Sequence, residues 1–238
     1  MLEAFGLSDP GCVRSKNEDY FISDCDAGLF ILADGMGGAN AGEYAARLSA
    51  EKIYNYLLDP AHRNGGGTLQ QAFEETNAIV RETAKDNPAL DGMGTTLVVA
   101  RKVNNDHFQI GSVGDSRAYL LSRKQLSLVT QDQTWVAEVG SRLGLSDEAI
   151  KKHPMRHVLT MAVGTCDELR MSLCDVALAK GDQLLLCSDG LHGVVQEENL
   201  INTLESEKTL PEKCHYLIEA ARAAGGPDNV TVVLIQSV

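Results

Sequence analysis

The sequence, 238 residues long, lacks many of the features by which a fold or a function is often recognised. Its six cysteines include no Cys-x-x-Cys pair, so neither a zinc site nor a thioredoxin-like redox motif is expected. Aromatic residues make up only 5%, so the core must be built mainly from Leu, Val, Ile and Ala. No apolar run is long enough to cross a bilayer, and the chain does not begin with a basic segment followed by an apolar one. We therefore expect a cytoplasmic protein with free thiols, without a membrane span or a signal peptide.

Positive charge is also scarce. The chain has 21 Lys and Arg residues against 33 Asp and Glu residues, and its formal net charge is −12. Such a surface repels nucleic-acid backbones and anionic membranes, so we expect neither as a partner. No heptad pattern or exposed apolar stripe argues for assembly, and we expect a monomer.

Motifs for covalent catalysis are missing as well. No cysteine is followed six positions later by arginine, as a phosphocysteine mechanism requires, and no Gly-x-Ser-x-Gly sequence marks a serine nucleophile. The six histidines include no His-Glu-x-x-His pair. His153 and His157 could face a substrate, but their polar surroundings favour a solvated helix end. His192 follows Asp189 closely and is expected to pack nearby.

Short segments rich in Val, Ile and Leu, bounded by Gly, Asp or Asn, predict many β-strands. These segments are residues 4–8, 20–23, 29–33, 95–101, 107–113, 117–121, 125–129, 173–177, 183–187 and 230–236. Apolar residues at helical spacing predict four helices, at residues 45–58, 69–80 after an N-cap at Thr68, 197–205 and 211–224. Because helices occur between groups of strands, antiparallel sheets covered by helices fit better than alternating β-α-β units.

Residues 132–164 differ from their neighbours because they are polar and interrupt the series of strands. Helical patterns at 135–143 and 146–153 lie within them. We interpret this stretch as a flap inserted into a single domain that spans residues 1–238. The glycine-rich residues 64–67 are expected to form a loop.

Several acidic residues lie at the ends of the predicted apolar strands, namely Glu18, Asp19, Asp34, Asp115, Asp189 and Asp228, the last followed by Asn229. One carboxylate at a strand end commonly starts a turn, and for any single position that interpretation is preferred. Repeated strand-end carboxylates suggest instead that the strand ends converge. Repulsion among converging carboxylates would raise their pKa values unless cations neutralise them. A ligand set made only of oxygen suits Mg²⁺ or Mn²⁺ rather than Zn²⁺.

Two further features accompany the acidic positions. Glycines follow Asp34 and Asp189 directly, where they permit sharp turns and close approach of a ligand to the backbone. The glycine run after Asp34 matches neither a dinucleotide fingerprint nor a Walker loop, so nucleotide binding has little support. Arg14 lies four residues before Glu18, and a guanidinium beside metal-bound carboxylates could hold a phosphate through two hydrogen bonds. An exposed arginine in a weak ion pair is the simpler alternative for Arg14 alone.

Six segments occur in an order that resembles the metal-dependent protein phosphatase family of type 2C, in its compact bacterial form. The segments are Asp9-x-Gly11-x-Val13-Arg14-x-x-Asn17-Glu18-Asp19, Ala33-Asp34-Gly35-Met36-Gly37-Gly38, Gly94-Thr95-Thr96, Val113-Gly114-Asp115-Ser116-Arg117, Cys187-Ser188-Asp189-Gly190-Leu191 and Asp228-Asn229-Val230-Thr231. Each segment alone is a weak signal, but their order is specific and covers essentially the whole chain.

The resemblance implies an α+β fold in which a central antiparallel β-sandwich is flanked on each side by a helix pair, with a site for two divalent cations, Mn²⁺ or Mg²⁺, at one end. It implies that Asp34 bridges the ions and that the Gly35 carbonyl binds one of them. Asp189 and Asp228 are expected to hold the other ion, and Asp115 a third, weaker one. The supporting residues implied are Asp19 and Glu18, which hold bound water or complete the ligand set, Asn229 beside them, and Arg14, which grips the substrate phosphate.

The implied reaction is hydrolysis of phosphoserine and phosphothreonine in proteins by a water that bridges the two cations. The implied partners are phosphorylated proteins and an opposing serine/threonine kinase of bacterial type. Animal members carry a histidine, thought to act as general acid, where this chain has Met36, so the resemblance identifies no proton donor here. Three alternatives are a non-catalytic binding module with the same fold, a phosphatase dedicated to an anti-sigma antagonist, and a dimetal nuclease or small-molecule phosphoesterase.

Overall fold

The computed structural model covers residues 1–238 and describes all of them except 38–40, 64–66, 105, 141–143 and 145–152. Three sequence predictions fall wholly or mainly on the residues left out. They are Gly38 of the glycine run, the loop at 64–67 and the flap helix at 146–153.

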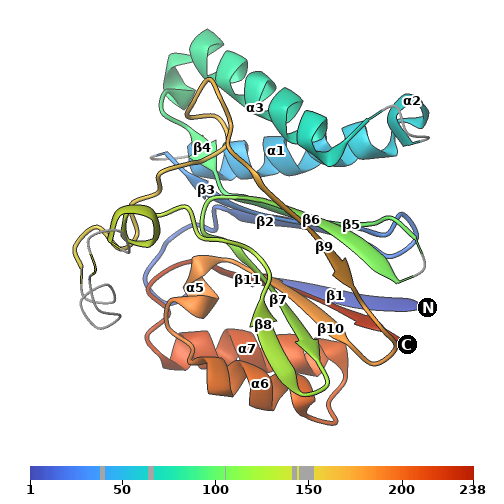
Figure 1. The fold of residues 1–238 in the computed structure, drawn as a ribbon. Helices are drawn as coiled ribbons and strands as arrows, with labels where there is room; N and C mark the ends of the chain where they lie inside the picture. Colours follow the sequence, from blue (N-terminus) through green and yellow to red (C-terminus); the bar gives the residue numbers. More distant parts are fainter. Residues whose placement is uncertain (38–40, 64–66, 105, 141–143, 145–152) are drawn as a thin grey trace.

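Two antiparallel sheets form the centre of the molecule (Figure 1). The first sheet has the strand order β1 (Leu2–Asp9), β11 (Val230–Ser237), β10 (Gln183–Cys187), β7 (Arg117–Ser122) and β8 (Gln125–Leu128). The second has the order β2 (Asp19–Asp24), β3 (Leu29–Met36), β5 (Leu97–Lys102), β6 (His107–Val113) and β9 (Ser172–Ala177), and β4 (Gly94–Thr95) pairs with β3. The hairpin predicted from the turn after residue 121 is confirmed by the pairing of β7 with β8.

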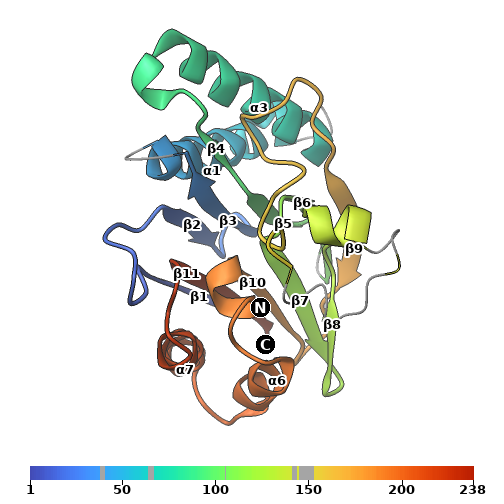
Figure 2. The same ribbon diagram turned by 90° about the vertical axis from the view of Figure 1, so that its left-hand side faces the viewer.

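Helices cover the outer face of each sheet and complete four layers (Figures 1 and 2). The second sheet is covered by α1 (Ala41–Leu58) and α3 (Leu69–Asp86), and the first by α6 (Glu197–Glu205) and α7 (Leu210–Ala223). The expected α+β sandwich with flanking helix pairs is therefore confirmed. The shorter helical turns are α2 (Pro60–Arg63), η1 (Pro88–Leu90), η2 (Val136–Gly140) and α5 (Asp189–His192). None of the described helices is long and apolar enough to cross a membrane.

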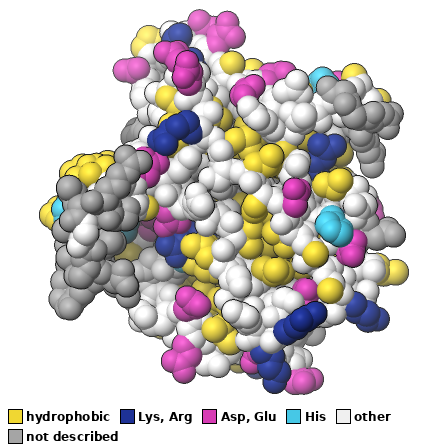
Figure 3. Space-filling view, viewed as in Figure 1, with side chains coloured by type: hydrophobic (Ala, Val, Ile, Leu, Met, Phe, Trp, Pro, Cys, Tyr) yellow, Lys and Arg dark blue, Asp and Glu magenta, His cyan; other side chains and the backbone are white. Residues whose placement is uncertain are grey.

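Three apolar clusters fill the spaces between the layers, and the alternation of side chains along each strand explains why. In β3, Phe30 and Leu32 face the other sheet, whereas Leu29, Ile31 and Ala33 face α1 and α3. A strand covered on both faces needs apolar residues at every position, which accounts for the continuous apolar runs in the sequence. Acidic side chains are instead spread over the surface seen in Figure 3, as the net charge of −12 requires.

Two details of the strands differ from the sequence prediction, and both concern Asp34. The predicted strand at 95–101 is divided at Thr96 into β4 and β5, which both pair with β3. The Thr96 amide donates to the Asp34 carbonyl (2.9 Å), but the Asp34 amide donates to the Thr96 hydroxyl (3.1 Å) in place of a backbone carbonyl. Strand β3 continues to Met36, so Asp34 lies within the strand instead of following it. The backbone of Asp34 is thus fixed by the neighbouring chain as well as by its own strand.

The predicted flap, residues 132–164, contacts the body of the protein near both of its ends. The Gln133 amide donates to the Gly114 carbonyl at 2.9 Å, and an isolated β-bridge joins Val163 to Thr95. A second bridge, between Thr134 and Leu159, joins the two sides of the flap to each other. The helical pattern predicted at 135–143 corresponds in its described part to the short π-helical turn η2, and residues 141–143 lie outside the described residues. Trp135 stacks on His153 with their ring centroids 4.8 Å apart, which links the two sides of the flap.

Candidate metal centre

A cleft of about 800 Å³ lies at one end of the sandwich. Strand register defines this end: Asp9 pairs with Val230 and Asp19 with Asp34 there, whereas Leu2 pairs with Ser237 at the opposite end, where both chain termini lie (Figure 1). The predicted site residues that line the cleft are Arg14, Glu18, Asp34, Gly35, Asp115, Asp189, Asp228 and Asn229. The antiparallel topology thus brings together residues that are far apart in sequence.

Asp19 is buried beneath this cleft, where the two sheets meet. One of its carboxylate oxygens accepts hydrogen bonds from the hydroxyls of Ser188 (2.8 Å), which directly follows β10, and of Thr231 (2.7 Å) on β11. The other oxygen is buried and has no hydrogen-bond partner. An unpartnered carboxylate oxygen beside a polar cleft is costly to bury, so it is a position where a cation or its water shell would be stabilising.

The carboxyl groups of the cluster are hard to ionise together. Burial, reinforced by neighbouring carboxylates, raises the pKa of Asp19 and of Asp115 to about 7 each. Burial and the nearby Asp19 and Asp189 also raise the pKa of Asp34 well above its ordinary value, and the pKa of Asp189 is raised by burial and by Asp228. Such mutual repulsion is relieved when a divalent cation replaces the protons.

The donor set therefore fits a hard divalent cation in its chemistry. Carboxylate oxygens and the Gly35 backbone lie on one cleft, and Mg²⁺ typically takes only one or two carboxylates while keeping several waters. Among the described residues, no three His, Cys, Asp or Glu side chains are already arranged to hold an ion. Ion binding would accordingly require some carboxylates to rotate, or water to complete the coordination.

Close backbone contacts fix the two aspartate-glycine pairs of the cleft. A side chain at position 35 would overlap the carbonyl of Gly42, and one at position 190 would overlap the carbonyl of Asn229. Gly35 also donates its amide to the Glu18 carbonyl at 3.1 Å. Glycine is therefore required by close packing, which holds the adjacent Asp34 and Asp189 against neighbouring loops.

Arg14 reaches into the cleft from the loop between β1 and β2. Its guanidinium donates to Asp228 at 2.8 Å, and this contact with Asp228 raises the pKa of Arg14. Its side chain is 53% exposed, so the guanidinium is accessible to a ligand in the cleft. Arg14 is thus placed where it could exchange a carboxylate partner for a phosphate.

Asp115 occupies the turn between β6 and β7, and a histidine contacts its backbone. The imidazole of His192 donates from Nε2 to the Asp115 carbonyl at 2.9 Å, and burial lowers the pKa of His192 to about 4. A neutral imidazole is therefore maintained at neutral pH. His192 packs near the site, as the sequence suggested, and its contact with Asp115 gives it a definite structural role.

The comparison with known proteins decides the family. The family model for protein phosphatase 2C matches residues 14–234. The chain belongs to the protein phosphatase 2C family. Serine/threonine phosphatase stp of Listeria monocytogenes is 34% identical over 241 residues, a match that covers 96% of this chain and 93% of that protein. Serine/threonine protein phosphatase PstP of Mycobacterium tuberculosis is 36% identical over 95% of this chain, which spans only 43% of PstP.

Solved structures of phosphatases agree with this family assignment. The serine/threonine phosphatase of S. agalactiae superposes with a TM-score of 0.90 at 30% identity, covering 100% of both chains. The catalytic domain of PstP in complex with 2 manganese ions gives a TM-score of 0.86 at 34% identity and covers 99% of this chain and 97% of that one. The 2C-type fold is thus shared over the full length of the chain.

Three residues of the flap also line the cleft, namely Arg156, His157 and Leu159. The Nδ1 atom of His157 lies 3.8 Å from an Asp189 carboxylate oxygen. The sequence favoured a solvated helix end for both flap histidines and left open that they face a substrate. His157 lies in a turn at 154–157 and lines the cleft, so the helix end is wrong for it, whereas its side chain is solvated, with 58% exposed. Arg156 carried no recognisable signal in the sequence, since its position depends on how the flap folds back.

Proposed function

We propose that this member of the 2C family hydrolyses phosphoserine and phosphothreonine esters in proteins with the help of bound Mn²⁺ or Mg²⁺. The observation that carries the proposal is the buried carboxylate cluster, with its unpartnered Asp19 oxygen and raised pKa values, beside an exposed arginine in one cleft. The names of the relatives from Listeria and Mycobacterium support the substrate class.

For the metal ligands we propose the set that sequence reasoning selected. Asp34 and the Gly35 carbonyl would hold one ion, and Asp34, Asp189 and Asp228 the second, while Asp115 would hold a third, weaker ion. The buried Asp19 would complete the ligand set or hold metal-bound water, and Glu18 and Asn229 would support it. Together these residues offer the oxygen donors that hard cations prefer.

Divalent cations supply Lewis acidity and activate water for attack on phosphorus. The residues of the chain bind and orient the substrate. Arg14 would donate two hydrogen bonds to phosphate oxygens and stabilise the charge that they carry. Met36 lines the cleft but carries no ionisable group, so the proton for the leaving oxygen must come from elsewhere.

The physiological role follows from this chemistry. The proposed substrates are proteins phosphorylated by a serine/threonine kinase of bacterial type, which the enzyme would oppose in the cytoplasm. We propose that the enzyme acts as a monomeric single domain in which the flap at 132–164 governs access to the cleft. Arg156 and His157 on the cleft wall support that role of the flap.

Hydrolysis of a phosphothreonine peptide and of a phosphotyrosine peptide, each with and without added Mn²⁺, tests the proposal. The expected result is Mn²⁺-dependent release of phosphate from the phosphothreonine peptide, abolished by a chelator, with much slower release from the phosphotyrosine peptide. Absence of hydrolysis under all conditions would refute the proposal and favour a non-catalytic module. Chelator-resistant hydrolysis would exclude the metal-dependent mechanism.

A further inference from the structure

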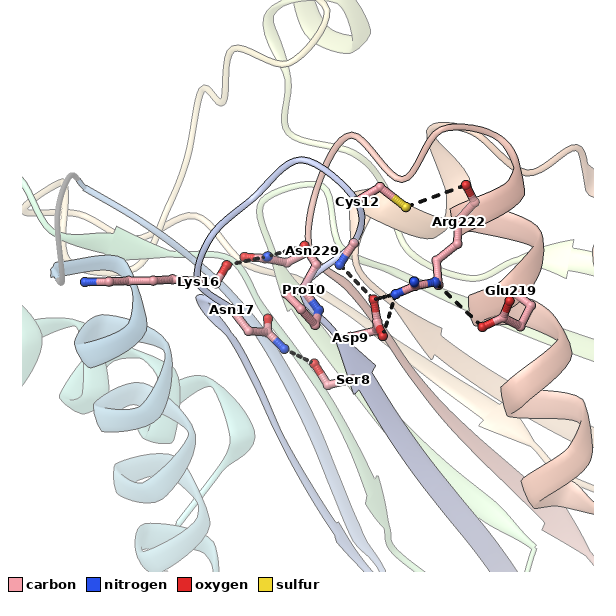
Figure 4. Close-up of polar contacts among 10 residues, drawn as sticks. Ser8, Asp9, Pro10, Cys12, Lys16, Asn17, Glu219, Arg222 and Asn229 are labelled. Carbon is pink, nitrogen blue, oxygen red and sulfur yellow. Dashed lines mark hydrogen bonds and ion pairs between the residues drawn. The ribbon is translucent and has the colours of Figure 1, made fainter.

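The loop that carries Arg14 has little apolar anchoring. It connects β1 to β2, and its residues 12–16 are all exposed, with the Val13 side chain 70% exposed. A segment without buried side chains gains its conformation from polar contacts, because packing contributes little. The position of Arg14 therefore depends on the hydrogen bonds that fix this loop (Figure 4).

Asn229 holds the two ends of the loop together. Its side-chain amide donates to the carbonyls of Pro10 (3.1 Å) and Lys16 (2.7 Å), and its side-chain oxygen accepts from the Glu18 amide at 2.8 Å. These contacts hold the two ends of the loop against one side chain. They do not by themselves fix its tilt relative to helix α7.

Asp9 and Arg222 provide the connection to that helix. Nη1 of Arg222 donates to both carboxylate oxygens of Asp9, at 2.8 and 3.0 Å, and the Gly11 amide donates to the same carboxylate at 2.8 Å. Asp9 is the last paired residue of β1, opposite Val230. The carboxylate thus joins the start of the loop to the last turn of α7, as Figure 4 shows.

The same junction reaches the segment that carries Asp228. The Cys12 amide donates to the Gly226 carbonyl at 2.8 Å, and a side chain at position 11 would overlap the carbonyl of Asp228. The start of the loop therefore contacts the segment 226–229 through residues 11 and 12, whereas Arg14 lies further along the loop. A change in the tilt of the loop would move Arg14 relative to Asp228.

We propose that Asp9 and Arg222 are positioning residues, which hold the Arg14 loop in the orientation that binds the substrate phosphate. This inference rests on the proposed phosphatase function. The ion pair is partly exposed and contributes little to global stability, so its main effect is local. A misplacement of a phosphate-binding guanidinium weakens substrate binding even when the fold is intact.

Steady-state kinetics of variants test the proposal. In Arg222→Ala we expect KM for a phosphothreonine peptide to rise roughly fivefold with kcat changed by less than about twofold. Arg222→Lys should recover part of the loss, because an ammonium can still donate to Asp9. Asp9→Asn keeps an acceptor but removes the charge, so we expect a smaller rise of roughly twofold to threefold.

A matched control variant removes an arginine ion pair that lies away from the loop. Arg47→Ala breaks the exposed Arg47–Glu51 ion pair on α1. This variant should keep the wild-type KM. If Arg47→Ala raised KM as much as Arg222→Ala, the effect would reflect lost surface charge, and the proposal would be overturned.

A double-mutant cycle identifies Arg14 as the group that is positioned. Once Arg14 is replaced by alanine, Arg222→Ala should raise KM no further. Independent, multiplicative effects would show that Arg222 acts elsewhere.

Circular dichroism and calorimetric titration of Mn²⁺ should give wild-type folding and metal affinity for Arg222→Ala. A loss of either would contradict a local role of Arg222. If the wild-type enzyme is active and Arg222→Ala has the wild-type KM, the positioning role is contradicted and the proposed function is not. If the wild-type protein is inactive, the proposed function itself is contradicted.

Discussion

Buried polar groups lie at both ends of the sandwich, and the two groups differ in how many of their atoms have hydrogen-bond partners. At the end near the chain termini, the ammonium of Lys213 donates to the Leu204 carbonyl (2.6 Å) and the Gln183 side chain (3.2 Å). Gln183 donates to the same carbonyl at 3.0 Å. At the cleft end, Asp19 keeps one carboxylate oxygen without a hydrogen-bond partner.

The difference separates a structural network from a functional one. Lys213 and Gln183 satisfy the C-terminal end of helix α6, and each group finds its partner within the chain. The carboxylates of the cleft instead raise one another's pKa, so the chain alone cannot satisfy them at neutral pH. The cleft is lined by fewer basic side chains than carboxylates, and divalent cations would supply the missing positive charge.

The largest expected effect comes from removing a carboxylate of the cleft. Asp34→Asn and Asp189→Asn should each lower kcat by roughly a thousandfold or more, because each removes a proposed metal ligand. Neither should lower the stability of the metal-free protein, since each relieves repulsion. Phosphate release with saturating Mn²⁺ and thermal unfolding without metal measure the two quantities. Near wild-type turnover in either variant would contradict its assignment.

A second effect is the pH dependence of metal binding. The pKa values of Asp19 and Asp115 are raised to about 7, and cations bind the deprotonated carboxylates. The apparent affinity for Mn²⁺ should therefore increase roughly tenfold per pH unit from about pH 6 toward 7 and level off above that. Titration calorimetry in two buffers that differ in ionisation enthalpy should detect the protons released. A pH-independent affinity would contradict the raised pKa values.

The same pKa values predict a trend in the stability of the metal-free protein. A carboxyl whose pKa is raised in the folded state keeps a proton that the unfolded chain has released. Between about pH 4 and about pH 7 these carboxyls should therefore lower the free energy of unfolding as the pH rises. His192 has the opposite effect, because burial lowers its pKa from 6.5 to about 4. Between these two pH values the unfolded chain binds a proton that the folded protein does not, so His192 raises the free energy of unfolding as the pH rises. Asp115→Asn should flatten the fall measured by chemical denaturation, and an unchanged slope would contradict it.

At the end of the sandwich near the chain termini, a substitution should affect stability alone. Lys213→Met keeps the apolar stem but removes the ammonium, which leaves the Gln183 side-chain oxygen without its donor. We expect a loss of about 1–3 kcal/mol in the free energy of unfolding, with kcat and KM unchanged. Denaturant titration and steady-state kinetics at a temperature where the variant is folded provide the measurement. A loss of turnover in the folded variant would contradict a purely structural role of the Lys213 network.

The smallest expected effect is that of Arg14→Ala. The guanidinium contacts the cleft from an exposed loop, so its removal should raise KM by roughly threefold to tenfold and leave kcat nearly unchanged. Steady-state kinetics with a phosphothreonine peptide distinguish this from the alternative. An unchanged KM with a reduced kcat would mean that Arg14 acts mainly in the transition state.

Features that depend on residues close together in the sequence could be predicted from it. Features that depend on contacts between distant residues could not. Apolar runs such as 183–187 identified their strands correctly, because two-sided burial leaves a local pattern. The division of 95–101 into β4 and β5 was missed, because at that point the distant Asp34 amide donates to the Thr96 hydroxyl instead of to a backbone carbonyl. Neither the cleft position of His157 nor the contact between Asp9 and Arg222 leaves a local pattern, since each joins residues brought together only by the fold.

The central claim is that the carboxylate cluster of the cleft binds two divalent cations. Calorimetric titration of the metal-free protein with Mn²⁺, repeated with Asp34→Asn and with Lys213→Met, tests it most directly. The expected result is binding of at least two ions to the wild type and to Lys213→Met, and loss of the tighter sites in Asp34→Asn. Failure of both Mn²⁺ and Mg²⁺ to bind the wild type, or unaltered binding to Asp34→Asn, would contradict the claim.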